Sequence, residues 1–211
     1  AGTSNGGGGG GPVNYSANNS TWKYLDDGSN QGTSWRATGF DDSNWSSGPA
    51  ELGYGDSDEA TTVNRGPARG HYATTYFRGS TNIPDPSTFV NFTISVTYDD
   101  AYAIYVNGKE VARHAGLTNN APFDEYANNT VGNNANDTLT IPASSFVAGT
   151  NIIAVEIHQS SGTSSDISFA LSLTGEISSG TQGGNFTPTP GAANRSYAIA
   201  VPPQIRQVSH L

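Results

Sequence analysis

A two-residue alternation of apolar and polar side chains is the feature that most restricts how this chain can fold. It runs through residues 92–98, 153–158 and 167–174. Successive side chains of a β-strand point to opposite faces, so each segment predicts a strand with one buried and one polar face. Such strands form sheets that pack face to face, which predicts an all-β sandwich of two antiparallel sheets. The buried set is Phe92, Ile94, Val96, Tyr98, Ile153, Val155, Ile157, Ile167, Phe169, Leu171 and Leu173.

The composition and length agree with one β-rich domain. Of 211 residues 26 are Gly, and only 13% are charged, a mixture that favours turns and strands over helices. This length suffices for one good core, with or without tails. We expect a Gly-rich tail at residues 1–13, the sandwich at residues 14–176, and a Pro/Gly/Thr linker with a short strand at residues 177–211.

The Asn107-Gly108 pair predicts a tight hairpin. Both residues adopt positive φ readily, as a type I′ turn requires. The flanking segments Tyr102–Val106 and Lys109–Arg113 are therefore expected to pair as adjacent antiparallel strands.

The residue types that the chain lacks and its net charge restrict the class of protein to which it can belong. The chain has no Cys and no Met, and its net charge is −9. An acidic surface opposes binding to phosphate backbones and suits a secreted or cell-surface bacterial protein. No apolar run approaches the ~18 residues that cross a bilayer. We expect no nucleic-acid partner and no membrane insertion, and, since no initiator Met is present, a module cut from a longer precursor.

Four segments together resemble the galactose-binding-like jelly roll. They are residues 35–45 (WRATGFDDSNW), 75–78 (TYFR), 99–100 (DD) and 105–109 (YVNGK). Domains of this family open glycosidases of the β-galactosidase and β-glucuronidase kind, and they recur as non-catalytic carbohydrate-binding modules. The resemblance implies a jelly-roll β-sandwich, although one fold carries many functions.

A second set of segments is similar to a module repeated in large secreted bacterial multidomain proteins. The set is residues 52–56 (LGYGD), 151–159 (NIIAVEIHQ) and 163–166 (TSSD). Residues 186–194 resemble the end of a neighbouring lamin-tail-like domain. The resemblance as a whole covers about residues 22–175.

Two long loops, residues 54–72 and 114–137, hold candidate ligand-binding residues. Long loops in compact domains are often functional, and sugars are bound by planar polar groups beside a stacking ring. Solvated loops shaped by Asn and Gly turns are the alternative. The predicted ligand-binding residues are Tyr54, Asp56, Arg69, His71, Tyr72, Asn119, Phe123 and Tyr126.

The three tryptophans have two possible roles. Trp22, Trp35 and Trp45 can stack on sugar rings or pack in the core. For Trp35 and Trp45, we expect core packing. Trp22 is open to either role.

Glu156 and His158 are predicted to share the polar face of their strand. They can contribute to a cleft for carbohydrate, or they form a surface contact or structural hydrogen bond. His158, Ser164 and Asp166 match a hydrolase triad by residue type alone. Because the sequence has no Gly-x-Ser-x-Gly elbow, we expect a protein that is not an enzyme.

Asp26, Asp27 and Asn30 group oxygen donors in a glycine-containing turn, which calcium favours. The resemblance also implies one structural Ca²⁺ near an early loop. An Asx-turn without metal is the alternative, and the carboxylates of Asp56, Asp58 and Asp166 can serve instead.

The pair Asp99 and Asp100 follows a predicted strand. Asp side chains at such a corner bond local backbone, with calcium ligation as the alternative. Scattered histidines and the absence of Cys argue against zinc.

The sequence therefore predicts a non-catalytic polysaccharide-binding module that tethers a parent protein to glycan. The alternative is a structural repeat of an extracellular fibre or surface stalk. In that case residues 1–13 or 204–211 would dock on another copy by strand addition.

Overall fold

All three alternating segments form strands in the computed structural model, which describes residues 12–132 and 134–177. They are β7 (Phe89–Asp99), β11 (Gly149–His158) and β12 (Ile167–Ile177). The remaining strands of the described residues are β1 (Val13–Ser16), β2 (Thr21–Leu25), β3 (Ser46–Pro49), β4 (Leu52–Tyr54), β5 (Thr61–Thr62), β6 (Thr74–Ile83), β8 (Ala101–Val106), β9 (Lys109–Arg113) and β10 (Ala135–Pro142).

Short 3₁₀ turns connect some of these strands: η1 (Ser34–Arg36), η2 (Pro86–Thr88) and η3 (Ala143–Ser145). In the described ranges, no helix has the length and apolarity to cross a membrane. The predictions of a Gly-rich tail, a linker and a terminal docking strand fall on residues 1–11 and 178–211, outside the described residues.

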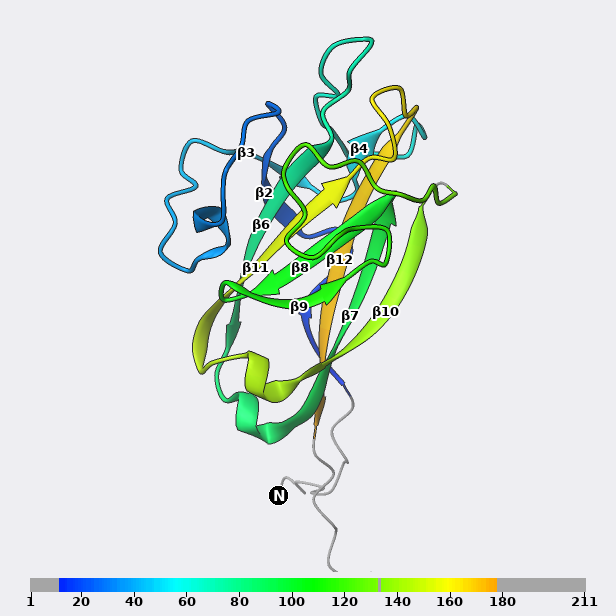
Figure 1. Ribbon diagram of the computed structural model, residues 1–211. Helices are drawn as coiled ribbons and strands as arrows, with labels where there is room; N and C mark the ends of the chain where they lie inside the picture. Colours follow the sequence, from blue (N-terminus) through cyan, green and yellow to red (C-terminus); the bar gives the residue numbers. More distant parts are fainter. Residues whose placement is uncertain (1–11, 133, 178–211) are drawn as a thin grey trace, which may run out of the picture. The chain divides into compact units, whose positions relative to one another are not determined.

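The strands form two sheets that face each other (Figure 1). Sheet A has the order β10-β7-β12-β4-β5, with β1 also paired to β12, and sheet B has the order β3-β2-β6-β11-β8-β9. The pairings are antiparallel except that of β4 with β5. Along the chain from β6 to β12, successive strands alternate between the sheets except at the β8–β9 hairpin. Early and late strands therefore interleave within each sheet. This is the topology of a jelly roll, and the predicted fold class is confirmed.

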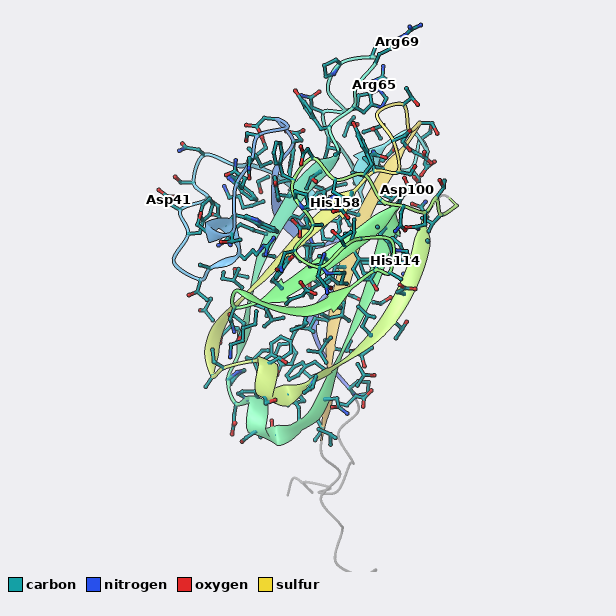
Figure 2. All side chains as sticks on the ribbon, viewed as in Figure 1. Asp41, Arg65, Arg69, Asp100, His114 and His158 are labelled. Atoms are coloured by element: carbon teal, nitrogen blue, oxygen red, sulfur yellow. The ribbon has the colours of Figure 1, made fainter. Side chains whose placement is uncertain are left out.

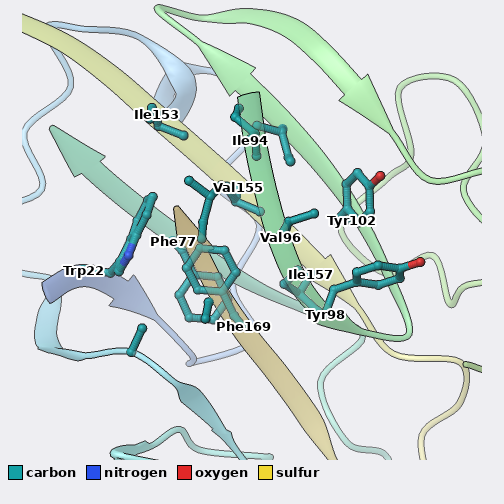
Figure 3. Packing of buried hydrophobic residues seen from close by; sticks show 14 of the residues in the cluster. Trp22, Phe77, Ile94, Val96, Tyr98, Tyr102, Ile153, Val155, Ile157 and Phe169 are labelled. Atoms are coloured by element: carbon teal, nitrogen blue, oxygen red, sulfur yellow. The ribbon is translucent and has the colours of Figure 1, made fainter. Parts of the chain in front are cut away.

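The inner faces of the sheets meet in one apolar core (Figure 3). Phe77 of sheet B stacks on Phe169 of sheet A with ring centroids 4.2 Å apart, and Trp22 meets Phe169 edge-on at 5.0 Å. On β7, Ile94 and Val96 are completely buried between more exposed neighbours. The alternating apolar residues thus drive the sheets together by burying their side chains.

The predicted hairpin is confirmed. Strands β8 and β9 pair in antiparallel register around Asn107 and Gly108, whose φ angles are 51° and 83°. The Asn107 side chain also accepts a hydrogen bond from the backbone N–H of Ile152 at 2.9 Å. This contact ties the turn to β11.

The long loops gather at one end of the sandwich, and η2 and η3 lie at the other (Figure 1). Hydrogen bonds join loops that are distant in sequence: the N–H of Gly70 donates to the carbonyl of Gly162, and that of Ala127 to the carbonyl of Gln159, at 2.9 and 2.8 Å. The loop end is therefore a connected structure built on the two sheets.

Candidate functional site

The outer face of sheet B is covered by two loop segments, residues 34–45 and 114–127, which we call the covering layer. Trp35 is completely buried and Trp45 is 7% exposed. Their rings stack with centroids 6.5 Å apart, and Tyr76 of β6 lies against Trp35 at 4.8 Å. The residues of this second, smaller core are Trp35, Trp45, Tyr76, Ala101, Ala103, Tyr105, Leu117, Ala121, Ala127 and Ala154.

Arg78 anchors the first covering segment to the sheet. Its Nε donates to the Asp42 carboxylate at 2.8 Å, and its Nη1 donates to the carbonyls of Trp35 and Ala37. The guanidinium also lies 5.2 Å from the Phe40 ring centroid. Arg78 is only 2% exposed, so these bonds satisfy a buried charge.

The prediction that Glu156 and His158 occupy a wet face is wrong. They are 1% and 0% exposed, because the covering layer lies over this part of β11. The ring Nδ1 of His158 is 2.7 Å from the carbonyl oxygen of Glu125, and the Thr74 hydroxyl donates to the carbonyl of Phe123 at 2.7 Å. His158 and Thr74 therefore hold the second covering segment on the sheet, a structural role.

Glu156 forms a buried polar centre beneath the covering layer. The Tyr105 hydroxyl donates to its Oε1 at 2.7 Å, Arg36 Nη2 lies 3.4 Å from the same oxygen, and His158 Nε2 lies 3.9 Å from Oε2. Burial alone would raise the pKa of Glu156, but His158, Tyr105 and Arg36 outweigh it and hold the pKa below its usual value. The carboxylate is therefore ionised at neutral pH.

Two adjoining cavities form a groove between the covering layer and residues 28–33. The first has a volume of about 260 Å³ and is lined by Asn30, Gly32, Thr33, Arg36, Tyr76, Asn120, Ala121, Pro122, Phe123, Asp124 and Glu156. The second has a volume of about 200 Å³ and is lined by Gly28, His71, Tyr72, Ala73, Thr74, Phe123, Asp124 and Tyr126. Phe123 and Asp124 line both, so the two cavities lie side by side. We call them the polar cavity and the aromatic cavity.

The structure brings four of the predicted ligand residues together in the aromatic cavity: His71, Tyr72, Phe123 and Tyr126. The Tyr126 hydroxyl donates to the carbonyl of His71 at 2.8 Å, which fixes its ring while leaving the residue 38% exposed. Tyr72 packs against Gly28, whose φ is 73° and where a Cβ atom would lie 2.3 Å from the Tyr72 ring. Glycine at this position is thus required by both the turn and the contact.

The other four predicted ligand residues lie elsewhere. Tyr54 is 9% exposed and its hydroxyl accepts a hydrogen bond from Gln159 Nε2 at 2.8 Å. Arg69 is exposed at a loop tip (Figure 2). Asn119 is exposed and lines neither cavity, and Asp56 belongs to an acidic cluster.

Asp27 and Asn30, predicted to hold calcium, bond their own loop. Asp27 Oδ1 accepts from the backbone N–H of Ser29 at 2.9 Å, and Asn30 Oδ1 accepts from that of Gly32 at 2.8 Å. Asp26 Oδ2 accepts from the N–H of Asn64. The contacts of Asp27 and Asn30 are the Asx-turns of the alternative interpretation, whereas that of Asp26 joins the loop to a distant segment.

An acidic cluster that can hold a cation forms instead from Glu51, Asp56 and Asp58. One oxygen from each lies within 4.8 Å of the others, and Glu51 Oε1 is buried with no hydrogen-bond partner in the described part of the chain. Burial and then the charges of its acidic neighbours raise the pKa of Glu51, against a bond with Ser168 that lowers it. Three grouped carboxylates supply the hard oxygen donors that Ca²⁺ favours.

Asp99 and Asp100 are both buried, at 2% and 0% exposure. Asp100 accepts hydrogen bonds from the backbone N–H groups of Val131 at 3.1 Å and Ser160 at 2.6 Å. The bonds are structural, as one interpretation predicts, but they join loops that are distant in sequence rather than the local backbone of the corner. Burial, together with Asp100 and Asp166, raises the pKa of Asp99 to about 9. Asp99 is therefore a neutral carboxylic acid at pH 7.

The groove also includes residues that sequence reasoning did not select: Arg36, Tyr76, Asn120 and Asp124. Arg36 lies in residues 35–45, one of the segments that resemble the galactose-binding-like jelly roll, and Tyr76 is on β6. Asn120 and Asp124 lie within the loop that was predicted to be functional, so the loop was identified but not these two residues that line the cavity. Core packing of Trp35 and Trp45 is confirmed, and Trp22 is likewise buried at 2% exposure.

Solved structures share this fold. A β-glucuronidase of an uncultured Clostridium sp. matches 79% of this chain with a TM-score of 0.50 and 13% identity. A calcium-binding mutant of Bacteroides uniformis beta-glucuronidase 2 matches 78% with a TM-score of 0.50 and 18% identity. The chain spans only 29% and 18% of these enzymes, respectively. No protein-family profile matches the sequence, and neither does a curated protein.

Proposed function

We propose that the groove binds carbohydrate and that the chain is a non-catalytic module of the galactose-binding-like type. The observation that carries this proposal is the juxtaposition of Tyr72, Phe123 and Tyr126 with a cavity of planar polar groups. A sugar ring presents an apolar C–H face to aromatic rings and a rim of hydroxyls to carboxylates, amides and guanidinium groups. The groove offers both kinds of partner side by side.

The fold gives independent support. The same β-sandwich occurs in two β-glucuronidases, which by their names act on sugars. Since the chain corresponds to a small part of each enzyme, a role in binding the polysaccharide fits better than a complete active site. Fold likeness alone does not define a function, so the groove residues carry the argument.

The module would act by tethering. A modest contact with a polysaccharide or a cell-surface glycan gains strength when several modules, or a module and an enzyme, act on the same chain. This mechanism suits a secreted or cell-surface bacterial protein with a net charge of −9.

Retention on insoluble polysaccharides tests the proposal. Tyr126→Ala removes an exposed ring, and we expect it to weaken retention by about tenfold, the effect of ~1.4 kcal/mol. Tyr126→Phe is the matched control: it keeps the ring, loses the hydrogen bond to His71, and should retain most binding. Val147→Ala controls for non-specific adsorption, because Val147 is an exposed apolar residue that lines neither cavity of the groove. Failure of a broad polysaccharide panel to retain the protein would reject the proposal.

We also propose that Glu51, Asp56 and Asp58 hold a structural Ca²⁺. The support is the grouping of their oxygens and the unpartnered Glu51 Oε1. Calcium should raise the melting temperature relative to EGTA, because a ligand that binds only the folded state stabilises it. The rise should disappear in Glu51→Gln and persist in Asp27→Asn. An equal melting temperature with and without calcium contradicts this assignment.

A further inference from the structure

The charged groups of the groove indicate which glycans it accepts. Arg36, Glu156 and Asp124 line the polar cavity, and Asp124 also lines the aromatic cavity. Among the described residues that line either cavity, Arg36 is the single Lys or Arg. The sum of these formal charges is therefore negative.

The positive charge of Arg36 is already matched within the protein. Its Nη2 lies 3.4 Å from Glu156 Oε1, and the guanidinium carbon lies 4.1 Å from the centroid of the Tyr105 ring. The Arg36 side chain is 12% exposed and that of Glu156 is 2% exposed. At such low exposure a charge interacts strongly with its neighbours, since water screens it poorly. An incoming carboxylate would compete with Glu156 for Arg36.

The remaining polar groups suit hydroxyls. Asn30 and Asn120 each offer a donor and an acceptor, and Asp124 accepts only. A sugar hydroxyl both donates and accepts and can pair with all of them. A sugar carboxylate only accepts and would face Asp124 and Glu156.

We infer that the groove selects an uncharged stretch of polysaccharide and discriminates against the same chain bearing uronic acids or other anionic groups. This inference rests on the proposed function and specifies its substrate class. Each cavity is smaller than the ~300–1,000 Å³ typical of pockets for drug-sized ligands. Each therefore accommodates one ring-sized unit, and the pair accommodates two adjacent units separated at Phe123.

Matched neutral and anionic polymers test the inference. The pairs are hydroxyethyl cellulose with carboxymethyl cellulose, methyl-esterified polygalacturonate with polygalacturonate, and xylan with glucuronoxylan, compared by affinity electrophoresis. For whichever pair binds, we expect the anionic member to bind at least about tenfold more weakly at low salt, a ratio that corresponds to ~1.4 kcal/mol. High salt should reduce the difference by screening.

Variants identify the source of the discrimination. Asp124→Asn removes an exposed carboxylate from the groove, and we expect the ratio of neutral to anionic binding to fall several-fold. Glu176→Gln removes the same charge from the exposed end of β12 and should leave the ratio unchanged. Because Asp124 is exposed, its replacement is expected to fold, which melting temperature would verify.

The outcomes separate the two proposals. Equal or tighter binding of the anionic member by the wild-type protein overturns the inference on charge and leaves carbohydrate binding intact. A ratio that Asp124→Asn does not change also overturns it. Failure to bind any member of the three pairs or of the wider polysaccharide panel overturns carbohydrate binding itself, and the inference with it.

Discussion

The outer faces of the two sheets both carry polar side chains, but one face is exposed to water and the other is covered by loops. On sheet A, the row Thr93, Ser95 and Thr97 of β7 is partly exposed, and β10 presents an exposed Thr138 beside it in register with Ser95. On sheet B, the outward side chains of β6 and β11 include Arg78, Glu156 and His158, and all three are buried. The first face is open to water and the second lies under the covering layer.

The comparison shows that polar outward residues can have two different roles. On sheet A, short polar side chains are partly exposed and bond one another, as when Ser95 donates to Asn136 Oδ1 at 3.1 Å. On sheet B, charged side chains are satisfied by the loops that cover them, and they fix those loops in place. The groove lies between the covering layer and residues 28–33, so the covered face carries the proposed binding site.

Replacing Trp35 should produce the largest difference in stability between substitutions on the two faces. Trp35→Ala empties the centre of the second core, and we expect a loss of about 3–5 kcal/mol in the free energy of unfolding, measured by urea denaturation. Val90→Ala on sheet A, where the side chain is 55% exposed, should change it by less than about 0.5 kcal/mol. Similar losses for both would mean that the covering layer contributes little to stability.

Replacing Arg78 should lower the free energy of unfolding nearly as much. Arg78→Met keeps the length of the side chain but leaves Asp42 and the carbonyls of Trp35 and Ala37 without their donor. We expect a loss of about 3 kcal/mol. Limited proteolysis should then cut within residues 34–45 before the strands. Cleavage that begins elsewhere would show that Arg78 does not anchor the segment.

Asp99 continues the exposed row of β7 into the covered loop end, where burial raises its pKa from 3.8 to about 9. The folded state holds a proton that the unfolded state releases, so stability falls as pH rises between about 4 and about 9. One such group lowers the free energy of unfolding by at most about 1.4 kcal/mol for each pH unit. Denaturation at several pH values would measure this slope.

Asp99→Asn provides the matched control for the pH effect. The amide imitates the neutral acid, because it keeps a donor and an acceptor, and it cannot ionise. We expect its stability relative to wild type to increase steadily from pH 5 to pH 9. A difference that does not depend on pH would contradict protonation of Asp99 in the folded protein.

The smallest effect on stability is expected for a substitution on the exposed outer face of sheet A. Thr138→Ala removes an exposed hydroxyl from β10, and the free energy of unfolding should change by no more than about 0.5 kcal/mol. A loss comparable to that of Arg78→Met would show that something covers sheet A in solution. Analytical ultracentrifugation would then test for a second copy on that face.

The fold was largely predictable because its determinants are local. The alternation of Phe92, Ile94 and Val96 specifies a strand with one buried face, and the Asn107-Gly108 pair specifies its hairpin. These signals depend on the geometry of a few neighbouring residues. Both signals therefore predict the local structure correctly whatever position the strand takes in the sandwich.

The site was predictable only in part. The loop of Tyr126 was identified from its length and residue types, but the sequence did not indicate which of its side chains line the groove. Nor did it indicate that Tyr54 would be buried, or that Glu156 would be covered by residues 34–45 and 114–127.

By itself the sequence determined the strands, the hairpin and the sandwich, since apolar periodicity is a property of each segment. Only the tertiary structure decided which outward face is wet and which is covered. A polar side chain in a strand is compatible with water or with a buried partner, and the choice depends on loops far away in the chain that bring a donor, an acceptor or a ring over it.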